Sequence, residues 1–235
     1  MAKSRIVERL GGLSTAAVAD ASVRLGFPLR LAPQEVRPLD GTGRIAGRVL
    51  PVRHYGSVDI FLEAMSDSEP GDVLVIDNGG RTDEACIGDL TVLEAKASGL
   101  SGVVVWGCHR DSEELGRIGF PVFSLGARPA GPRRLDEREP QALDSARFGD
   151  FVVTKQDIVL ADADGVIFVA KKGAGEILSA ASAISKTERS QADAIGRGER
   201  LRDQLKFDVY MKRRASDSGY TFRKHLRAIG GAVEV

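Results

Sequence analysis

Two short groups of residues in this sequence combine side chains that could bind a small anionic ligand together with a metal ion. The first group is Gly88-Asp89-Leu90 and the second is Arg110-Asp111. Arginine carries a planar guanidinium that matches a carboxylate, and aspartate supplies a hard oxygen ligand that Mg²⁺ or Mn²⁺ accepts. A glycine at a helix start lets a ligand approach the unpaired backbone N–H groups. The two groups therefore predict a carboxylate clamp at Arg110, a metal ligand at Asp111 and an oxyanion site at the amides of residues 88–90.

The segments around these residues have the pattern of a parallel βαβ unit. Residues 72–77 form an apolar run of strand length, residues 89–98 have a helical pattern that stops at Gly99, and residues 102–106 form a second apolar strand. This spacing predicts two parallel strands joined by a right-handed crossover. Because ligands of open α/β sheets bind beyond the carboxyl ends of the parallel strands, both groups should lie at one sheet edge.

The same pattern predicts where these elements end and which faces they bury. Asn78-Gly79-Gly80 should break the first strand, and residues 80–87 should form a long approach to the helix. Leu90, Leu93 and Ala97 fall on one face of that helix, so we expect them to pack on the core.

Each candidate residue also has an ordinary structural interpretation. Asp89 can be simply the N-cap of the helix, without a role in binding or catalysis. Arg110-Asp111 can be a solvated pair of surface charges. His109 adjoins the second group and could serve as a base, whereas His54 and His225 show no metal-ligand spacing. The βαβ placement favours function for the two groups taken together.

The rest of the chain predicts a mixed α/β protein. In its first half we expect a helix capped by Ser14 and ending at Gly26, a strand over 44–52 and a helix capped by Ser57. A Pro- and charge-rich loop over roughly 127–145 should precede strands at 151–153, 158–161 and 166–170. Helices should follow from Gly173 onward, with interruptions at Gly196 and Gly198 and a last short helix at 222–226. Asp164-Gly165 predicts a hairpin between the last two strands.

Composition excludes several classes of protein. The formal net charge of zero argues against nucleic-acid binding through bulk positive charge, although the tail from Lys186 to Arg214 carries nine basic and five acidic residues. No segment is long and apolar enough for a membrane span. We see no secretory signal, and Cys86 and Cys108 have no zinc spacing. We therefore expect a cytoplasmic protein with reduced cysteines, no membrane partner and no nucleic-acid partner.

Asp89, twenty intervening residues and then Arg110-Asp111 resemble the D-x20-R-D motif of the RraA-like family. That family includes the class II 4-hydroxy-4-methyl-2-oxoglutarate/4-carboxy-4-hydroxy-2-oxoadipate aldolases and the regulators of ribonuclease activity A. Some members were mislabelled as demethylmenaquinone methyltransferases. The likeness covers roughly residues 10–180, and its matching segments are residues 13–20, 70–77, 102–123 and 162–166.

The resemblance implies a swivelling β/β/α-type single domain with a parallel βαβ core and a helical C-terminal extension. We place the RraA-like domain at residues 1–185 and the extension, packed on the same or a neighbouring subunit, at 186–235. The resemblance also implies a homotrimer or homohexamer with active sites at subunit interfaces. Residues 133–147 depart from the family's usual strand-rich segment, the tail beyond Lys186 matches a subgroup only, and we cannot match the carboxylate that a neighbouring subunit adds to some aldolase sites.

The activity implied by this resemblance is a divalent-metal-dependent carbon–carbon lyase that cleaves 4-hydroxy-2-oxo acids to pyruvate. Oxaloacetate decarboxylation should accompany it, since both reactions pass through the pyruvate enolate. Arg110 and Asp89 are the expected catalytic residues, Asp89 by ordering a water. Gly88, Asp89, Leu90 and Arg110 should bind substrate, and Asp111 should hold Mg²⁺ or Mn²⁺, largely through water. The alternative is a non-catalytic regulator that binds an RNase or helicase partner.

Overall fold

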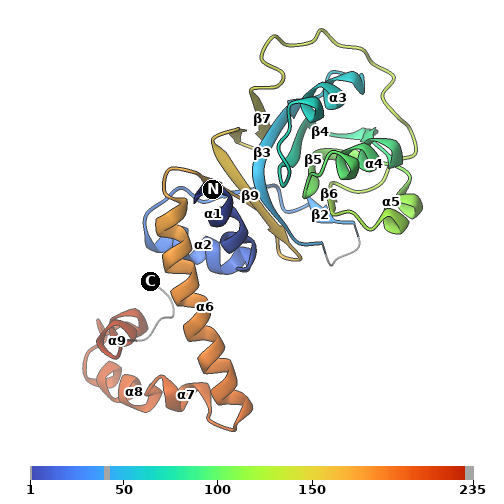
Figure 1. The fold of residues 1–235 in the computed structure, drawn as a ribbon. Coiled ribbons are helices and arrows are strands. Elements are labelled where there is room, and N and C mark those ends of the chain that lie inside the picture. Colours follow the sequence, from blue (N-terminus) through green and yellow to red (C-terminus); the bar gives the residue numbers. More distant parts are fainter. Residues whose placement is uncertain (1, 40–42, 231–235) are drawn as a thin grey trace.

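A mixed eight-stranded sheet organises the computed structural model, which describes residues 2–39 and 43–230. The four central strands β3 to β6 run parallel, and the strands on both edges pair antiparallel (Figure 1). In spatial order the strands are β1 (Arg30–Leu31), β10 (Gly165–Ala170), β9 (Asp157–Asp162), β3 (Ile45–Arg53), β4 (Val73–Ile87), β5 (Gly102–His109), β6 (Val122–Ser124) and β2 (Arg37–Pro38).

The predicted βαβ unit is present as β4, helix α4 (Asp89–Ala97) and β5. Val73 pairs with Gly102 and Asp77 with Trp106 in a parallel register. Val73, Leu74, Val75 and Ile76 are all fully buried, as expected for a strand that is covered on both faces. The crossover therefore brings the end of β5 and the start of α4 to the same edge.

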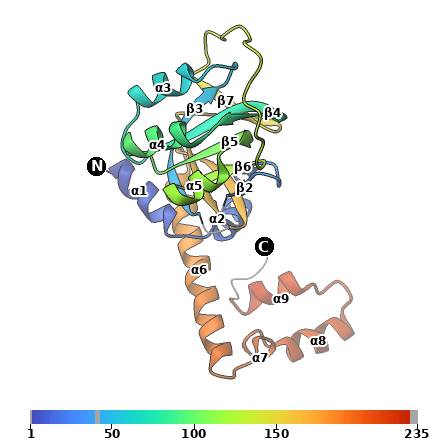
Figure 2. The ribbon, with the colours of Figure 1, turned by 90° about the vertical axis from the view of Figure 1, so that its right-hand side faces the viewer.

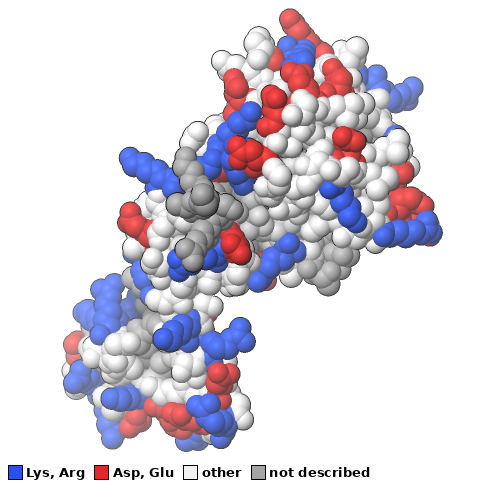
Figure 3. Space-filling view, in the orientation of Figure 1, with Lys and Arg blue, Asp and Glu red and all other residues white. Residues whose placement is uncertain are grey.

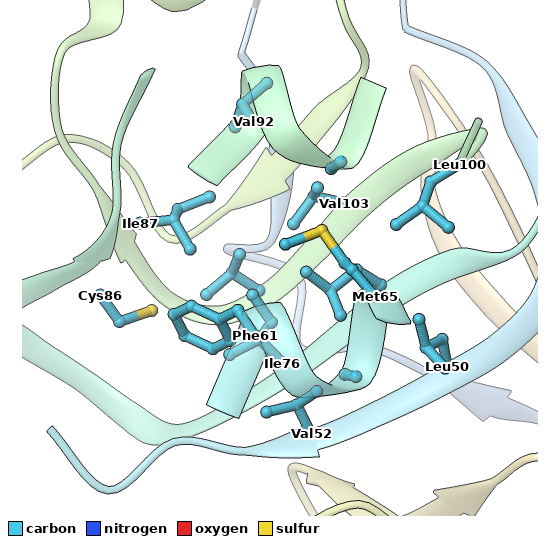
Figure 4. Close-up of a cluster of buried hydrophobic side chains, with 14 of the residues drawn as sticks. Leu50, Val52, Phe61, Met65, Ile76, Cys86, Ile87, Val92, Leu100 and Val103 are labelled. Atoms are coloured by element: carbon cyan, nitrogen blue, oxygen red, sulfur yellow. The ribbon is translucent and has the colours of Figure 1, made fainter. Parts of the chain in front are cut away.

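Helices cover one face of this part of the sheet. α3 (Asp59–Ser66), α4 and α5 (Ser112–Ile118) lie side by side there (Figure 1). Figure 4 shows Phe61 and Met65 of α3 and Val92 of α4 packed with Ile76 and Val103 of the sheet. This apolar layer fixes the N-termini of α4 and α5 relative to the strand ends.

A second β layer covers the opposite face. The hairpin of β7 (Ser145–Phe148) and β8 (Phe151–Thr154) buries Phe148 and Val153 against Val75, Val104 and Phe168. The resulting helix, sheet and hairpin layers confirm the predicted β/β/α architecture.

A second group of helices covers β9 and β10. α1 (Ala2–Gly11), α2 (Thr15–Arg24) and α6 (Ala174–Gly196) bury an apolar cluster against these strands. Ser14 caps α2 as predicted, because its side chain accepts a hydrogen bond from the amide of Ala17. Asp164-Gly165 forms the predicted hairpin turn, with Gly165 paired to Asp162.

The C-terminal helices form an arm that projects from the sheet. α6 extends well beyond the strands and carries a small lobe of α7 (Leu201–Gln204), α8 (Phe207–Ser216) and α9 (Phe222–Ala228) (Figure 2). Tyr210, Phe222 and His225 pack together at the centre of this lobe. The expected domain boundary after residue 185 falls inside α6, so the chain continues there without a linker.

Three predictions about the elements near the site were wrong. β4 does not end at Asp77 but runs to Ile87, with register shifts against β5. Gly79 and Gly80 have φ angles of 66° and 68°, so they form a bulge in the strand and do not break it. The face of α4 that was predicted to be buried is exposed. Leu90 is 76% exposed to solvent, and Ala97 is exposed as well, because Val92 and Ala95 are the residues that face the sheet. Ser57 does not cap α3, which begins after Val58 without a side-chain cap.

Cys86 and Cys108 are buried free thiols. None of the helices in the described residues is long and apolar enough to cross a membrane.

Candidate active site

Asp111 occupies the turn between β5 and α5 in a left-handed conformation, with φ 60° and ψ 38°. Aspartate tolerates this conformation better than most residues do, although it costs of the order of 1 kcal/mol. The side chain does not cap α5. Instead, Oδ2 accepts a hydrogen bond of 3.3 Å from the amide of Asp89. The turn therefore aims the carboxylate across the strand ends toward the start of α4.

Gly88 is required by this close approach. An ideal Cβ at residue 88 would lie 2.3 Å from Asp111 Oδ2 and 3.2 Å from Arg110 Nε. A side chain at residue 88 would displace the Asp111 carboxylate from this position, so the glycine lets the two predicted groups meet. From the sequence we predict that Gly88 lets a ligand approach the backbone; in the structure the residue also makes room for the Asp111 carboxylate.

Asp89 begins α4, and its side chain bonds within its own helix turn. Oδ1 accepts a hydrogen bond of 2.7 Å from the amide of Leu90, whereas Oδ2 has no hydrogen-bond partner among the described residues. Two of the three amides proposed for the oxyanion site, those of Asp89 and Leu90, are thus already bonded within the chain. One carboxylate oxygen of Asp89 remains available for a water.

Arg110 projects from the end of β5 beside Asp111. Its backbone amide donates to the carbonyl of Ile87 at 3.0 Å, and Nε lies 3.4 Å from Asp111 Oδ2. The side chains of Arg110 and Asp111 are 49% and 35% exposed. Both groups are therefore held in place by the backbone but remain accessible to a ligand.

The Pro-rich connection contributes a contact that the sequence argument missed. An ideal Cβ at Gly131 would lie 2.8 Å from Arg110 Nη1, so the guanidinium packs directly on the backbone there. The amide of Ala85 donates to the carbonyl of Ala130 at 2.7 Å, which ties this connection to β4. The two small residues between Pro129 and Pro132, Ala130 and Gly131, are the one signal in the sequence for this close approach.

His109 has a structural role here. Nδ1 lies 2.7 Å from Ser124 Oγ and Nε2 lies 3.0 Å from Ser112 Oγ, so both ring nitrogens are engaged. Burial lowers the pKa of His109 despite the opposing charge of Asp111, which keeps the ring neutral near pH 7. The side chain links β5, β6 and α5 below the candidate site.

A hard metal ion fits the carboxylate of Asp111. The described residues contain no group of three His, Cys, Asp or Glu side chains that could hold a metal. However, Oδ1 of Asp111 has no partner within the described part of the chain, and the side chain is partly exposed. Mg²⁺ often keeps several waters and binds through one or two carboxylates, so a single anchor suffices.

The fold and this corner define a three-layer β/β/α protein with a polar, half-open site at the carboxyl ends of its parallel strands. The sequence model of the Aldolase/RraA family matches residues 15–168. The chain belongs to this RraA-like family.

Several known proteins are similar to this chain. An uncharacterised protein of Methanocaldococcus jannaschii is 33% identical over 55% of this chain and 61% of its own length, so the match spans less than two thirds of that relative. A protein of Aromatoleum aromaticum named "Putative 4-hydroxy-4-methyl-2-oxoglutarate aldolase" is 30% identical over 56% of this chain and 81% of its own.

Two solved structures extend the comparison. An uncharacterised protein from Pseudomonas syringae pv. tomato has a TM-score of 0.75 at 25% identity, covering 84% of this chain and 95% of its own. The RNA-processing inhibitor RraA from Thermus thermophilis has a TM-score of 0.55 at 26% identity, covering 64% of this chain and 90% of its own.

Proposed function

We propose that this protein is a divalent-metal-dependent carbon–carbon lyase that cleaves 4-hydroxy-2-oxo acids to pyruvate. The observation that carries this proposal is the meeting of Arg110, Asp111 and the start of α4 at Gly88. A 2-oxo acid needs a cation for its carboxylate and a metal for its adjacent oxygens, and this corner offers both. The aldolase name of the Aromatoleum aromaticum relative points to the same chemistry.

The residues have distinct roles in the proposed reaction. Asp111 would hold Mg²⁺ or Mn²⁺, largely through water, and the metal would polarise the 2-oxo group. Arg110 binds the C1 carboxylate and stabilises the negative charge that develops beside it. Asp89 orders a water that takes the proton of the C4 hydroxyl. The C4 oxygen then forms the carbonyl of the second product as the C3–C4 bond breaks, and the electron pair of that bond forms the pyruvate enolate. The proton taken up by the water at Asp89 is returned to C3, which gives pyruvate.

Oxaloacetate decarboxylation follows from the same arrangement. Loss of CO₂ from oxaloacetate leaves the same enolate, and Arg110 stabilises it in the same way. This side activity needs no proton transfer to the water at Asp89. An Asp89→Asn variant should therefore lose aldol cleavage more strongly than oxaloacetate decarboxylation.

A panel of 4-hydroxy-2-oxo acids tests the proposal and identifies the substrate. Pyruvate release is followed with the full chain in Mg²⁺, in Mn²⁺ and in excess chelator. Metal-dependent release from at least one member of the panel supports the lyase. Absence of release from every member, and from oxaloacetate, overturns it.

We propose further that a neighbouring copy completes the site, in a homotrimer or homohexamer. Arg110 and Asp111 are half open to solvent, and the adjacent Leu90 and Leu93 present exposed apolar side chains on α4. The projecting arm (Figure 2), with its excess of basic residues, is suited to pack on a second copy; Figure 3 shows lysines and arginines spread over the lower lobe, together with acidic and other residues. Light scattering coupled to size-exclusion chromatography tests the assembly, and a monomer overturns it.

Similarity to the Thermus thermophilis RraA favours one second candidate, a non-catalytic regulator that binds an RNase or helicase. The two functions make different predictions for the corner. A regulator binds its partner when Arg110 and Asp111 are replaced and releases no pyruvate, whereas the lyase loses turnover in the same variants.

A further inference from the structure

A cavity of about 470 Å³ opens at the carboxyl end of β3 and at the bulge in the middle of β4. Its walls come from these two places, β5, the connection before β7, and the β7–β8 hairpin. The lining residues are Arg53, His54, Asp77, Asn78, Gly79, Arg81, Trp106, Arg134, Asp136, Glu139, Arg147 and Val152. None of these is a residue of the Arg110–Asp111 corner, so the cavity is a separate place in the fold.

A buried polar network forms one wall of the cavity. Arg134 Nη2 donates to Asn78 Oδ1 at 2.8 Å, and Arg134 Nε donates to Glu84 Oε1 at 2.9 Å. His54 Nδ1 lies 2.8 Å from the same Asn78 oxygen. His54, Asn78 and Glu84 are all buried. These bonds hold the guanidinium of Arg134 and the ring of His54 in fixed positions.

The network leaves His54 with a free acceptor. Because Asn78 Oδ1 accepts, Nδ1 of His54 is the donor in their bond. Burial lowers the pKa of His54, while the bond to Asn78 opposes the shift only in part, so the ring is neutral near pH 7. Nε2 then carries a lone pair, and it has no hydrogen-bond partner within the described residues.

Donors without partners also line the cavity. Each carboxylate oxygen of Asp77 accepts one hydrogen bond, from the amide of Gly79 at 2.8 Å and from that of Arg147 at 3.0 Å. The guanidinium of Arg147 and the indole Nε1 of Trp106 form no hydrogen bond or ion pair with any residue that the structure describes. These groups can donate to a bound anion without breaking a contact in the protein.

Two exposed carboxylates that line the cavity contact its arginines. Glu139 pairs with Arg53, and Asp136 pairs with Arg134. Both carboxylates belong to the irregular connection before β7 and are more than half exposed. Because each carboxylate keeps more than half of its surface in solvent, which weakens an ion pair, an external anion can compete with them.

We propose that this cavity is a second anion-binding site, which takes the carboxylate or phosphate group of a small molecule between Arg53, Arg134 and Arg147. His54 Nε2 accepts a hydrogen bond from a hydroxyl or protonated oxygen of that molecule. This inference is independent of the proposed lyase activity, because it needs neither a metal nor Arg110.

Trp106 makes the proposal directly measurable, since it is the one tryptophan of the 235-residue sequence. The full chain is titrated with inorganic phosphate and, separately, with succinate, at constant ionic strength and in excess chelator. The chelator keeps any metal-dependent site silent. A saturable change in Trp106 emission in the phosphate arm identifies a phosphate group, and one in the succinate arm a carboxylate. No saturable change in either arm overturns the proposal, whatever the result of the pyruvate assays.

Three variants connect the signal to the cavity. Arg147→Ala, which removes the free guanidinium, should weaken binding about tenfold, the effect of one charge-assisted bond. Glu139→Gln, which removes a competing carboxylate, should tighten binding several-fold. Arg200→Ala is the matched control, because Arg200 pairs with Asp203 on the arm and should leave affinity unchanged. Wild-type affinity in both Arg147→Ala and Glu139→Gln overturns the assignment even if the titration saturates.

Discussion

Two neighbouring corners of one sheet edge hold their charges in different ways. At the end of β5, Arg110 and Asp111 are adjacent in sequence, partly exposed and positioned by the backbone. At the ends of β3 and β4, His54, Glu84 and Arg134 come from three distant segments and are fixed by hydrogen bonds among buried side chains. In the first corner the polar atoms stay accessible to a ligand, whereas in the second most polar atoms form hydrogen bonds within the protein.

This difference explains which corner could be predicted from sequence. Adjacent residues that follow an apolar strand are visible as a motif, and parallel strands place their carboxyl ends together. Arg134 shows no such signal, because it lies in an irregular connection and meets Glu84 only after folding. The comparison suggests that the two corners will respond oppositely to mutation, the first in activity and the second in stability.

The largest expected effect on stability is at the buried corner. Arg134→Ala leaves Glu84, whose side chain is 5% exposed, without its main cationic partner. Breaking such a buried pair costs about 3–5 kcal/mol. Urea unfolding of the variant measures the loss. Arg117→Ala, which removes an exposed pair on α5, is the control and should cost under about 1 kcal/mol. Equal losses in both variants would show that the two corners do not differ.

A single added methyl group is expected to lower activity strongly at the exposed corner. Gly88→Ala places a Cβ 2.3 Å from Asp111 Oδ2, so the carboxylate must move. A displacement of about 1 Å costs on the order of 100-fold in turnover. Steady-state assays of pyruvate release measure this. The control is Gly116→Ala, where a Cβ on α5 would meet nothing within 4 Å and turnover should be unchanged. Wild-type turnover in Gly88→Ala would remove the packing argument for this site.

A smaller effect links the two corners through their histidines. Burial lowers the pKa of both His54 and His109, so the unfolded chain binds these protons at higher pH than the folded chain. Stability should therefore fall as pH decreases below about 6.5, by at most about 1.4 kcal/mol per pH unit for each histidine. Unfolding of wild type and His54→Asn is compared at pH 8 and pH 5.5. The variant should lose less stability between these two values, and an equal loss would contradict the assigned burial effect.

Sequence reasoning anticipated the long elements better than their faces. The apolar run of β4 and the Ser14 cap of α2 are local signals, and both were read correctly. The direction of Leu90 and Leu93 was not, because a nine-residue helix has two candidate apolar faces and packing selects Val92 and Ala95. The continuation of β4 through Gly79 and Gly80 was missed for a similar reason. A glycine pair signals a turn locally, and only pairing with β5 turns it into a bulge.

The proposed lyase activity depends on the roles of Arg110 and Asp111, and oxaloacetate turnover tests these roles most directly. Pyruvate release is measured for wild type, Arg110→Ala and Asp111→Ala in Mg²⁺, after subtraction of the rate without protein. Removal of a group that stabilises charge in the transition state should lower turnover by about 100-fold or more, and chelator should abolish wild-type activity. Wild-type turnover in both variants would contradict the site.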